Sequence, residues 1–307
     1  MSSIAIISGP TATGKTSVAL DFCQSAGGIE IINADSMLVY RGMDIGTAKP
    51  SSEELQRVPH HLINIRNPDE PFTAGDFVRE ADKAIEEIQR RNKKALIVGG
   101  TGFYLKALLF GLWPTAASNA EVRRKLEILT NETLYSELDK RDHKTAEKVG
   151  KNDRYRLVRA MEIIELTGKS PSDFAGEQKN TLSQRYKLIL IDRETTELEQ
   201  RIKERTNEML DRGLIEEVKL LLETFPNTRA LNSVGYKQTK DFLSGIKPPG
   251  RKIEEGTIGL RNEIVLATRQ LVKRQRTWFK SQKEEESFIL DKEKNRLVEF
   301  LKQFYGA

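Results

Sequence analysis

Gly9-Pro10-Thr11-Ala12-Thr13-Gly14-Lys15-Thr16 follows the short apolar run 4–7 and precedes the amphipathic segment 17–22. This order of strand, glycine-bearing loop and helix is the context in which G-x-x-x-x-G-K-[ST] binds phosphate. Loop N–H groups and the helix N-terminus face the anionic oxygens, Lys15 adds a mobile positive charge, and the Thr16 hydroxyl can bind Mg²⁺. We therefore expect a bound di- or triphosphate here; the alternative is a glycine-rich turn without a ligand.

The loop leaves open which phosphate compound is bound. Nucleotide-binding enzymes of this class normally hold Mg²⁺ with an acidic residue at the end of a second buried strand. The matching run 95–98 ends instead in Gly99-Gly100-Thr101-Gly102. Asp35 follows another apolar run, where it can bind Mg²⁺, act as a base toward a substrate, or cap the following turn. Asp35 and Thr101, the latter also a candidate helix N-cap, fall at the sheet edge where parallel α/β folds bind ligands.

The composition bounds the class of protein. At 307 residues, with 38% hydrophobic and 31% charged residues, the chain fits one large domain or a domain with an insertion. It has no apolar run of about 18 residues and enters a strand at once, so we expect neither a membrane span nor a signal peptide. The single Cys23 excludes internal disulfides and cysteine-rich zinc sites, and His60-His61 lack a third metal ligand. These features indicate the cytoplasm, and the net charge of +5 suggests a polyanionic partner.

Apolar strand runs alternate with amphipathic helices, which predicts an α/β fold with a parallel sheet. After the first strand, the predicted strands are 30–33, 95–98, 186–191 and an edge strand at 288–290, and the longer helices are 74–91, 195–212, 214–223 and 253–281. Glycine and proline punctuate 41–72, which we expect to be irregular. From 115 to 185 the chain is charged, with helical spacing and no convincing strand. We therefore predict a core, 1–114 and 186–307, and a helical insertion, 115–185, with helices at 119–130, 132–140, 143–149 and 153–167.

Two parts of the chain suit an RNA surface. The insertion is basic at 123–125 and 151–159, although a solvated helix face is the common fate of such residues. The last long helix has seven Lys or Arg and one acid, Glu263, between 261 and 283, with Trp278-Phe279 inside that run. Cations contact phosphates and aromatic rings stack on unpaired bases. The alternative is an amphipathic helix that packs Leu266, Leu271 and Trp278 on the core.

Together these blocks resemble the bacterial tRNA dimethylallyltransferases, also called tRNA isopentenyltransferases, over nearly the whole chain. The most specific block is 33–50, Asn-Ala-Asp-Ser-Met-Leu-Val-Tyr-Arg-Gly-Met-Asp-Ile-Gly-Thr-Ala-Lys-Pro. The others are 9–16, 60–63, 98–104, 152–156, 159–162, 234–237, 268–269, 273–275 and 277–279. The resemblance implies a P-loop NTPase-like fold. It also implies transfer of a dimethylallyl group from its diphosphate to N6 of adenosine 37 in tRNA, with release of diphosphate.

The resemblance further implies roles for individual residues. Asp35 would be the general base, Thr101 and Arg123 the other catalytic residues, and Thr16 the ligand of Mg²⁺. The residues implied for the diphosphate are Gly9, Pro10, Thr11, Ala12, Thr13, Gly14, Lys15 and Thr16. Those implied for tRNA are Asp35, Ser36, Met37, Leu38, Thr101, Arg123, Tyr155, Arg156, Arg159, Gly235, Tyr236, Lys237, Lys273, Arg274, Gln275, Arg276, Thr277, Trp278, Phe279 and Lys280. Leu38 stands where Gln is frequent in the family, which leaves the contacts around the substrate base open.

By this resemblance we expect a monomer that binds dimethylallyl diphosphate and the anticodon stem-loop of tRNA. The target adenosine would be flipped into a channel at the sheet edge. An allylic diphosphate also removes the need for a nucleotide-type carboxylate after the run 95–98. Two other classes compete with this interpretation. A P-loop kinase for a small molecule has no use for a basic aromatic helix, and an RNA-binding protein with a nucleotide switch needs neither Asp35 nor Thr101.

Overall fold

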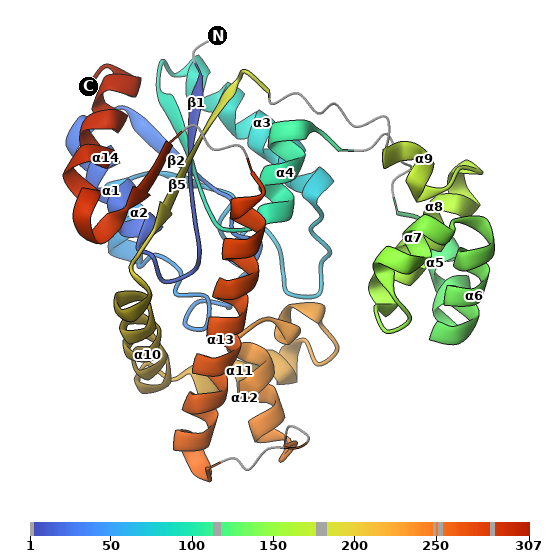
Figure 1. Cartoon of the computed structure of the whole chain (residues 1–307). Helices are drawn as coiled ribbons and strands as arrows, with labels where there is room; N and C mark the ends of the chain where they lie inside the picture. Colours follow the sequence, from blue (N-terminus) through green and yellow to red (C-terminus); the bar gives the residue numbers. More distant parts are fainter. Residues whose placement is uncertain (1–2, 113–117, 176–182, 248–249, 251–253, 283–285) are drawn as a thin grey trace. The chain divides into compact units, whose positions relative to one another are not determined.

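The chain forms two compact units in the computed structural model, which describes residues 3–112, 118–175, 183–247, 250, 254–282 and 286–307. We call Met1–Leu105 with Gln184–Ala307 the core unit and Lys106–Ser183 the insertion unit (Figure 1). The insertion unit begins within α4 (Gly102–Phe110), whereas the sequence suggested a start at 115. That suggested boundary falls in 113–117, outside the described residues.

A six-stranded sheet forms the centre of the core unit, in the order β3-β2-β4-β1-β5-β6. Its strands are β1 (Ile4–Ser8), β2 (Ile29–Asn33), β3 (His60–His61), β4 (Lys94–Val98), β5 (Tyr186–Asp192) and β6 (Glu286–Ile289). All neighbouring strands pair in parallel, so the predicted α/β fold is confirmed, and β6 is an edge strand as predicted. Every residue of β1 and β2 is buried, as expected for parallel strands covered on both faces.

Helices cover this sheet (Figure 1). The apolar side chains of α1 (Lys15–Ala26) and α14 (Leu290–Tyr305) pack on one set of strand residues, with the rings of Phe22 and Tyr305 5.8 Å apart. α3 (Ala74–Arg90) begins at a capping box made by Thr73 and Asp76. Its predicted apolar positions are all buried: Phe77, Ala81, Ile85 and Ile88. The 3.6-residue period therefore located this helix to within one residue.

A second apolar cluster lies beside the carboxyl ends of the strands. It is built by α10 (Thr195–Asp211), α11 (Leu214–Thr224), the short 3₁₀ helix η1 (Arg229–Asn232), α12 (Tyr236–Leu243) and α13 (Gly256–Lys280). Leu214, Val218 and Tyr236 are buried there against Met43. Figure 1 shows α13 running from these helices up to the sheet edge. This long helix therefore links the second cluster to the strand ends.

The stretch 41–72 is more ordered than its glycines and prolines suggested. It contains α2 (Ser52–Arg57) and the two-residue strand β3, both too short to produce a recognisable period. Each β3 histidine has a protein partner: His60 Nδ1 lies 2.7 Å from the Val58 carbonyl, and His61 Nε2 lies 2.7 Å from Glu30 Oε2. The histidine pair is thus part of the sheet edge.

The insertion unit is helical, with its own apolar core. Its helices after α4 are α5 (Ala120–Glu127), α6 (Asn131–Arg141), α7 (His143–Val149), α8 (Arg154–Thr167) and α9 (Pro171–Ala175). Leu134, Leu138 and Leu157 are completely buried between α6 and α8. The helices α5 to α8 agree closely with the predicted ranges, and within the described residues of this unit the one-turn α9 was missed. Across both units, none of the described helices has the length and apolar character that a membrane span requires.

Two charged side chains fix the loop that follows β2. Glu217 of α11 accepts the N–H groups of Asp44, Ile45 and Gly46, at 3.0, 2.8 and 3.1 Å, and the hydroxyl of Tyr236 at 2.6 Å. Lys49 is buried and donates to the Tyr40 carbonyl, the Asp44 carboxylate and Asn64 Oδ1. The most specific sequence block, 33–50, is therefore a loop anchored to α11.

Replacing Glu217 by Ala removes the acceptor of these four donors, one of which belongs to a buried tyrosine. We expect the free energy of unfolding to fall by about 2–4 kcal/mol, because buried donors are left without a partner. Urea denaturation measures this change. The neighbouring Glu216 is exposed, and the E216A variant is the matched control, expected to change stability by less than about 1 kcal/mol. Equal stabilities for the two variants would contradict the anchoring role.

Candidate active site

The phosphate-binding loop connects β1 to α1 at the carboxyl edge of the sheet. Gly9 passes so close to β5 that a Cβ placed on it would lie 1.9 Å from the Ile191 carbonyl oxygen, so no larger residue fits. Gly14 has a φ of +92° immediately before α1, and Ala12 adopts a left-handed φ of +65°. The Thr13 hydroxyl donates to the Pro10 carbonyl at 2.9 Å. The loop is thus held in one shape with its N–H groups at the start of α1.

Lys15 lies inside this loop. Its ammonium donates to the carbonyl oxygens of Gly9 and Pro10, at 2.8 and 2.6 Å. Burial lowers the pKa of Lys15 to about 8, the charge of Asp35 opposes that shift and the charge of Arg205 adds to it. The site therefore brings a partly desolvated ammonium, a guanidinium and a carboxylate within electrostatic reach of one another.

Three arginines hold the loop from the side of α10. Arg193 Nε donates to the Thr13 carbonyl at 2.7 Å, and Arg201 Nε donates to the Ala12 carbonyl at 3.0 Å. Arg205 donates to the Thr11 hydroxyl at 3.2 Å and to the Thr47 carbonyl at 3.1 Å. None of the three arginines was predicted from the sequence as part of the site. Arg201 and Arg205 lie four residues apart on one face of α10, and this spacing is the signal that could have found them, whereas Arg193 precedes the helix.

Asp35 and Thr101 lie together, as predicted from the strand ends. Asn33 clamps the Asp35 backbone: its Oδ1 accepts the Asp35 N–H at 2.8 Å and its Nδ2 donates to the Asp35 carbonyl at 2.9 Å. Asp35 Oδ1 accepts the N–H of Met37 at 2.9 Å, so the suggested turn-capping role is present as well. The Thr101 hydroxyl accepts the Ser36 N–H at 2.9 Å. Thr101 therefore ties the β4–α4 loop to the residue next to Asp35.

The end of β4 has no room for a carboxylate. A Cβ on Gly99 would lie 2.2 Å from the carbonyl carbon of Ala34, because the chain after β2 crosses directly over it. On the other side of β1, Asp192 ends β5 and is bound by Arg276 at 2.8 and 3.0 Å. The backbone packing therefore excludes any side chain, and with it a carboxylate, at position 99, directly after β4.

The residues expected on the last long helix divide between its two sides. Lys273, Arg274, Thr277 and Lys280 are exposed, whereas Gln275, Arg276 and Trp278 are half-buried and Phe279 is buried. Helical spacing puts the exposed set on one face. The buried positions of α13 are Gly259, Leu260, Ile264, Val265, Val272 and Phe279. Leu266, Leu271 and Trp278, which the alternative interpretation packed on the core, are half-buried. Phe279 is buried and has no exposed surface for tRNA, so the tRNA contact predicted for Phe279 is wrong.

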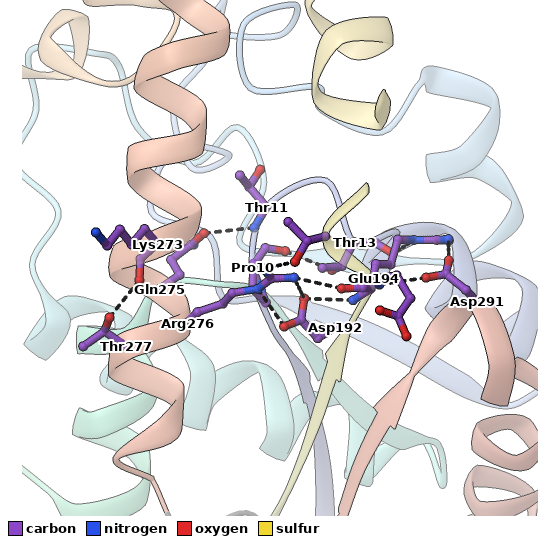
Figure 2. A network of polar contacts seen from close by, with 12 residues as sticks. Pro10, Thr11, Thr13, Asp192, Glu194, Lys273, Gln275, Arg276, Thr277 and Asp291 are labelled. Atoms are coloured by element: carbon purple, nitrogen blue, oxygen red, sulfur yellow. Dashed lines mark hydrogen bonds and ion pairs between the residues drawn. The ribbon is translucent and has the colours of Figure 1, made fainter. Parts of the chain in front are cut away.

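Gln275 and Arg276 face the catalytic loops (Figure 2). Gln275 Oε1 accepts the Thr11 N–H at 2.9 Å, and its Nε2 donates to the Gly100 carbonyl at 3.1 Å. Arg276 pairs with Asp192 and donates to the Arg193 carbonyl at 2.8 Å. These two half-buried side chains, which were predicted to contact tRNA, thus also make contacts within the protein. The charge pattern indicated a basic helix without indicating which way it is rotated.

The expected tRNA residues around α12 also differ in exposure. Tyr236 is completely buried, and its ring lies where a Cβ on Gly46 would come within 2.5 Å. Its hydroxyl is bound by Glu217, so Tyr236 shapes the anchored loop and has no surface for tRNA. Lys237 is exposed and pairs with Asp241, and Gly235 begins the helix with a φ of +91°.

Four further predicted residues belong to the insertion unit. The guanidinium of Arg123 lies over the ring of Tyr155, 5.2 Å from its centroid, and Tyr155 is exposed. Arg159 donates to the completely buried carboxylate of Glu162 at 2.7 Å. Arg156 is exposed and pairs with Asp153 at 3.1 Å. Within this unit α5 and α8 thus bring Arg123 and Tyr155 into contact.

The residues at the phosphate loop suit Mg²⁺. Among the described residues no three His, Cys, Asp or Glu side chains group as a metal site. Thr16 lies half-buried in the first turn of α1 and supplies one hard oxygen. Mg²⁺ typically takes one or two protein oxygens together with substrate phosphate oxygens and water. The donor at Thr16 fits that pattern when a diphosphate is bound.

Comparison with known proteins shows which family this chain resembles. The model of the family described as IPP transferase matches residues 38–282. The chain is 43% identical to "tRNA dimethylallyltransferase 1" of Citrifermentans bemidjiense over 279 residues, 90% of this chain and 88% of that protein. It is 40% identical to the "tRNA dimethylallyltransferase" of Alkaliphilus metalliredigens over 305 residues, 96% of this chain and 95% of that protein.

Solved structures agree. The tRNA isopentenylpyrophosphate transferase of Bacillus halodurans superposes with a TM-score of 0.69 at 33% identity, covering 99% of this chain and 97% of that one. A eukaryotic dimethylallyltransferase acting on tRNA superposes with a TM-score of 0.76 at 30% identity, covering 91% of this chain and 70% of that one. These neighbours confirm the predicted P-loop NTPase-like fold. The chain belongs to the IPP transferase family.

Proposed function

We propose that this protein transfers the dimethylallyl group of dimethylallyl diphosphate to N6 of adenosine 37 in tRNA and releases diphosphate. The observation that carries the proposal is the placement of Asp35 within electrostatic reach of Lys15 and Arg205 at the phosphate loop. A base for the acceptor amine and cations for the leaving group thus share one site. Membership of the family, and relatives named as tRNA dimethylallyltransferases, support the same reaction.

The first half of the reaction breaks the bond between the allylic carbon and the diphosphate oxygen. The electron pair leaves with diphosphate, and positive charge builds up on the delocalised allyl group. Lys15 and the N–H groups of the loop stabilise the departing anion, and Arg205 lies next to them. Mg²⁺ held by Thr16 and the diphosphate would supply Lewis-acid stabilisation of the same oxygens.

The second half forms the bond between carbon and N6. An exocyclic adenine amine is a weak nucleophile, and Asp35 takes the proton that it loses. The Met37 N–H binds Asp35 Oδ1 and orients the carboxylate, which leaves Oδ2 for the amine. Thr101, bound to the adjacent Ser36, contacts the same amine or the diphosphate. Asn33 fixes the Asp35 backbone on both sides, which we propose keeps the base in place.

The tRNA is proposed to bind in two places, one on each unit. On the core unit the exposed face of α13 offers Lys273, Arg274, Thr277 and Lys280 to phosphates. On the insertion unit Arg123 and the exposed Tyr155 offer a cation and a ring. Ser36, Met37 and Leu38 follow Asp35 and would contact the flipped adenine. We further propose that the protein acts as a monomer in the cytoplasm.

Replacing Asp35 by Ala tests the reaction and the base together. With Mg²⁺, dimethylallyl diphosphate and unmodified tRNA, we expect wild-type protein to add one dimethylallyl group to adenosine, detected by mass analysis of the nucleosides. D35A should lose about 100-fold or more in turnover, since the general base is gone, and keep its tRNA affinity. Asp69 is exposed, and D69A is the control with normal turnover. Hydrolysis of ATP without any prenylated nucleoside would favour a kinase instead.

The lowered pKa of Lys15 predicts a pH dependence of diphosphate binding. Lys15 loses its charge as the pH rises through about 8, whereas a diphosphate monoester is almost fully ionised above about pH 7. The affinity for an unreactive alkyl diphosphate should therefore fall about tenfold between pH 7 and pH 9. Bound anion favours the ammonium, so binding at pH 8 should take up protons. Titration calorimetry in buffers of different ionisation enthalpy measures both, and a flat affinity from pH 7 to 9 would contradict the assignment.

The exposed basic face of α13 can be removed without touching its inward contacts. In the triple variant K273A/R274A/K280A we expect weaker tRNA binding and a salt dependence reduced by about 2 in the slope of log K against log salt. Pyrophosphate affinity should stay unchanged. A charge-matched control on another exposed helix of the core unit is R79A/K83A/R90A. If that control lost as much tRNA affinity, α13 would have no special role in binding.

A further inference from the structure

We propose that Gln275 is a positioning residue for this reaction, which keeps the phosphate loop and the loop of Thr101 at a fixed distance from each other. The inference rests on the proposed function and goes beyond it, because family resemblance had placed Gln275 among the tRNA contacts. Its side chain instead joins two loops of the site that are far apart in the sequence. Figure 2 shows it reaching from α13 to Thr11.

Both polar atoms of the Gln275 amide are used. Oε1 accepts the N–H of Thr11 at 2.9 Å, and Nε2 donates to the carbonyl of Gly100 at 3.1 Å. A primary amide is the side-chain group that offers an acceptor and a donor together at this reach. A carboxylate has no donor for the carbonyl, and an ammonium has no acceptor for the N–H. The residue type thus matches the two backbone groups that it connects.

Gly100 and Gly102 flank Thr101, and α13 contacts both. Trp278, one turn after Gln275, covers Gly102 so closely that a Cβ there would lie 2.7 Å from the indole ring. A Cβ on Gly100 would lie 3.1 Å from Gln275 Nε2 and 3.6 Å from Lys15 Nζ. The absence of side chains at these two glycines lets α13 approach the loop. The position of Thr101 is thereby set by α13 on both sides.

The contacts form a continuous path from the diphosphate loop to the base. Thr11 binds Gln275, Gln275 binds Gly100, and the Thr101 hydroxyl binds the Ser36 N–H beside Asp35. The reacting carbon lies between the diphosphate and the adenine amine, so the distance between phosphate loop and base decides whether they react. A misplacement of about 1 Å can cost about 100-fold in rate. Gln275 is the side chain that bridges the two loops.

The outer side of the same turns carries Lys273, Arg274 and Thr277, which are exposed. In Figure 2 Lys273 extends away from the phosphate loop. Contact with RNA and contact with the catalytic loops therefore occupy opposite faces of α13. Removal of the Gln275 amide should then affect chemistry and diphosphate binding, and spare tRNA affinity.

The experiment compares wild type with Q275M, which conserves volume and removes both hydrogen bonds, and with Q275A. The control is Q270A, since Gln270 is exposed on the same helix. We expect about a tenfold or larger loss of kcat with both Gln275 variants, a raised KM for dimethylallyl diphosphate, and a tRNA Kd within about twofold of wild type. The melting temperature of Q275M should stay close to that of Q270A, since packing is kept.

The opposite pattern overturns the proposal. A weakened tRNA Kd with normal kcat at saturating tRNA would make Gln275 an RNA contact, and full activity of Q275M would make it a packing residue. Failure of the proposed function is recognised separately, because wild-type protein would then form no prenylated nucleoside. In that case weaker binding of inorganic pyrophosphate by Q275M than by Q270A still supports the positioning of the phosphate loop, and equal binding overturns it.

Discussion

The site depends on hydrogen bonds that hold the phosphate loop from outside. A loop whose N–H groups face an anion turns carbonyl oxygens away from it, and these need donors of their own. Arg193 and Arg201 donate to the carbonyls of Thr13 and Ala12, and Gln275 accepts the Thr11 N–H. With these groups bound, the loop keeps its shape, including the left-handed Ala12. The phosphate site therefore includes α10 and α13, which carry Arg201 and Gln275, and also Arg193 just before α10.

This arrangement concentrates positive charge where water is partly excluded. Burial lowers the pKa of both Lys15 and Arg205, because the charged forms of these side chains lose hydration at this position. Asp35 offsets part of that charge, and Asp192 is already bound by Arg276. A bound diphosphate supplies the missing negative charge. The same electrostatic imbalance that favours substrate binding then favours diphosphate as a leaving group, since its charge increases as the allylic bond breaks.

Sequence patterns predicted the features that depend on local rules. The phosphate loop, the helix predicted at 74–91 and the strand-end position of Asp35 follow from spacing and period alone. The two-residue β3 and the one-turn α9 are too short for a period, and Arg201 and Arg205 look like ordinary solvated charges until α10 is packed on the loop. The basic helix was identified, but its rotation was not: Gln275, Arg276, Trp278 and Phe279 turn inward because Gly100, Gly102 and Asp192 provide partners far away in the sequence.

The absence of a carboxylate directly after β4 is explained by the close packing of Gly99, and this packing bears on the chemistry of the site. Gly99 lies against the backbone of Ala34, so the chain can bring Asp35 and Thr101 together only if no side chain stands between the ends of β2 and β4. Enzymes that attack phosphorus use that position for a Mg²⁺ ligand. In a prenyl transfer the acceptor amine attacks the allylic carbon. The enzyme must then hold the leaving group and take a proton from the amine. Close packing of these two strand ends leaves no side chain at Gly99 and brings Asp35, the proposed base, close to Thr101, which fits the proposed prenyl transfer.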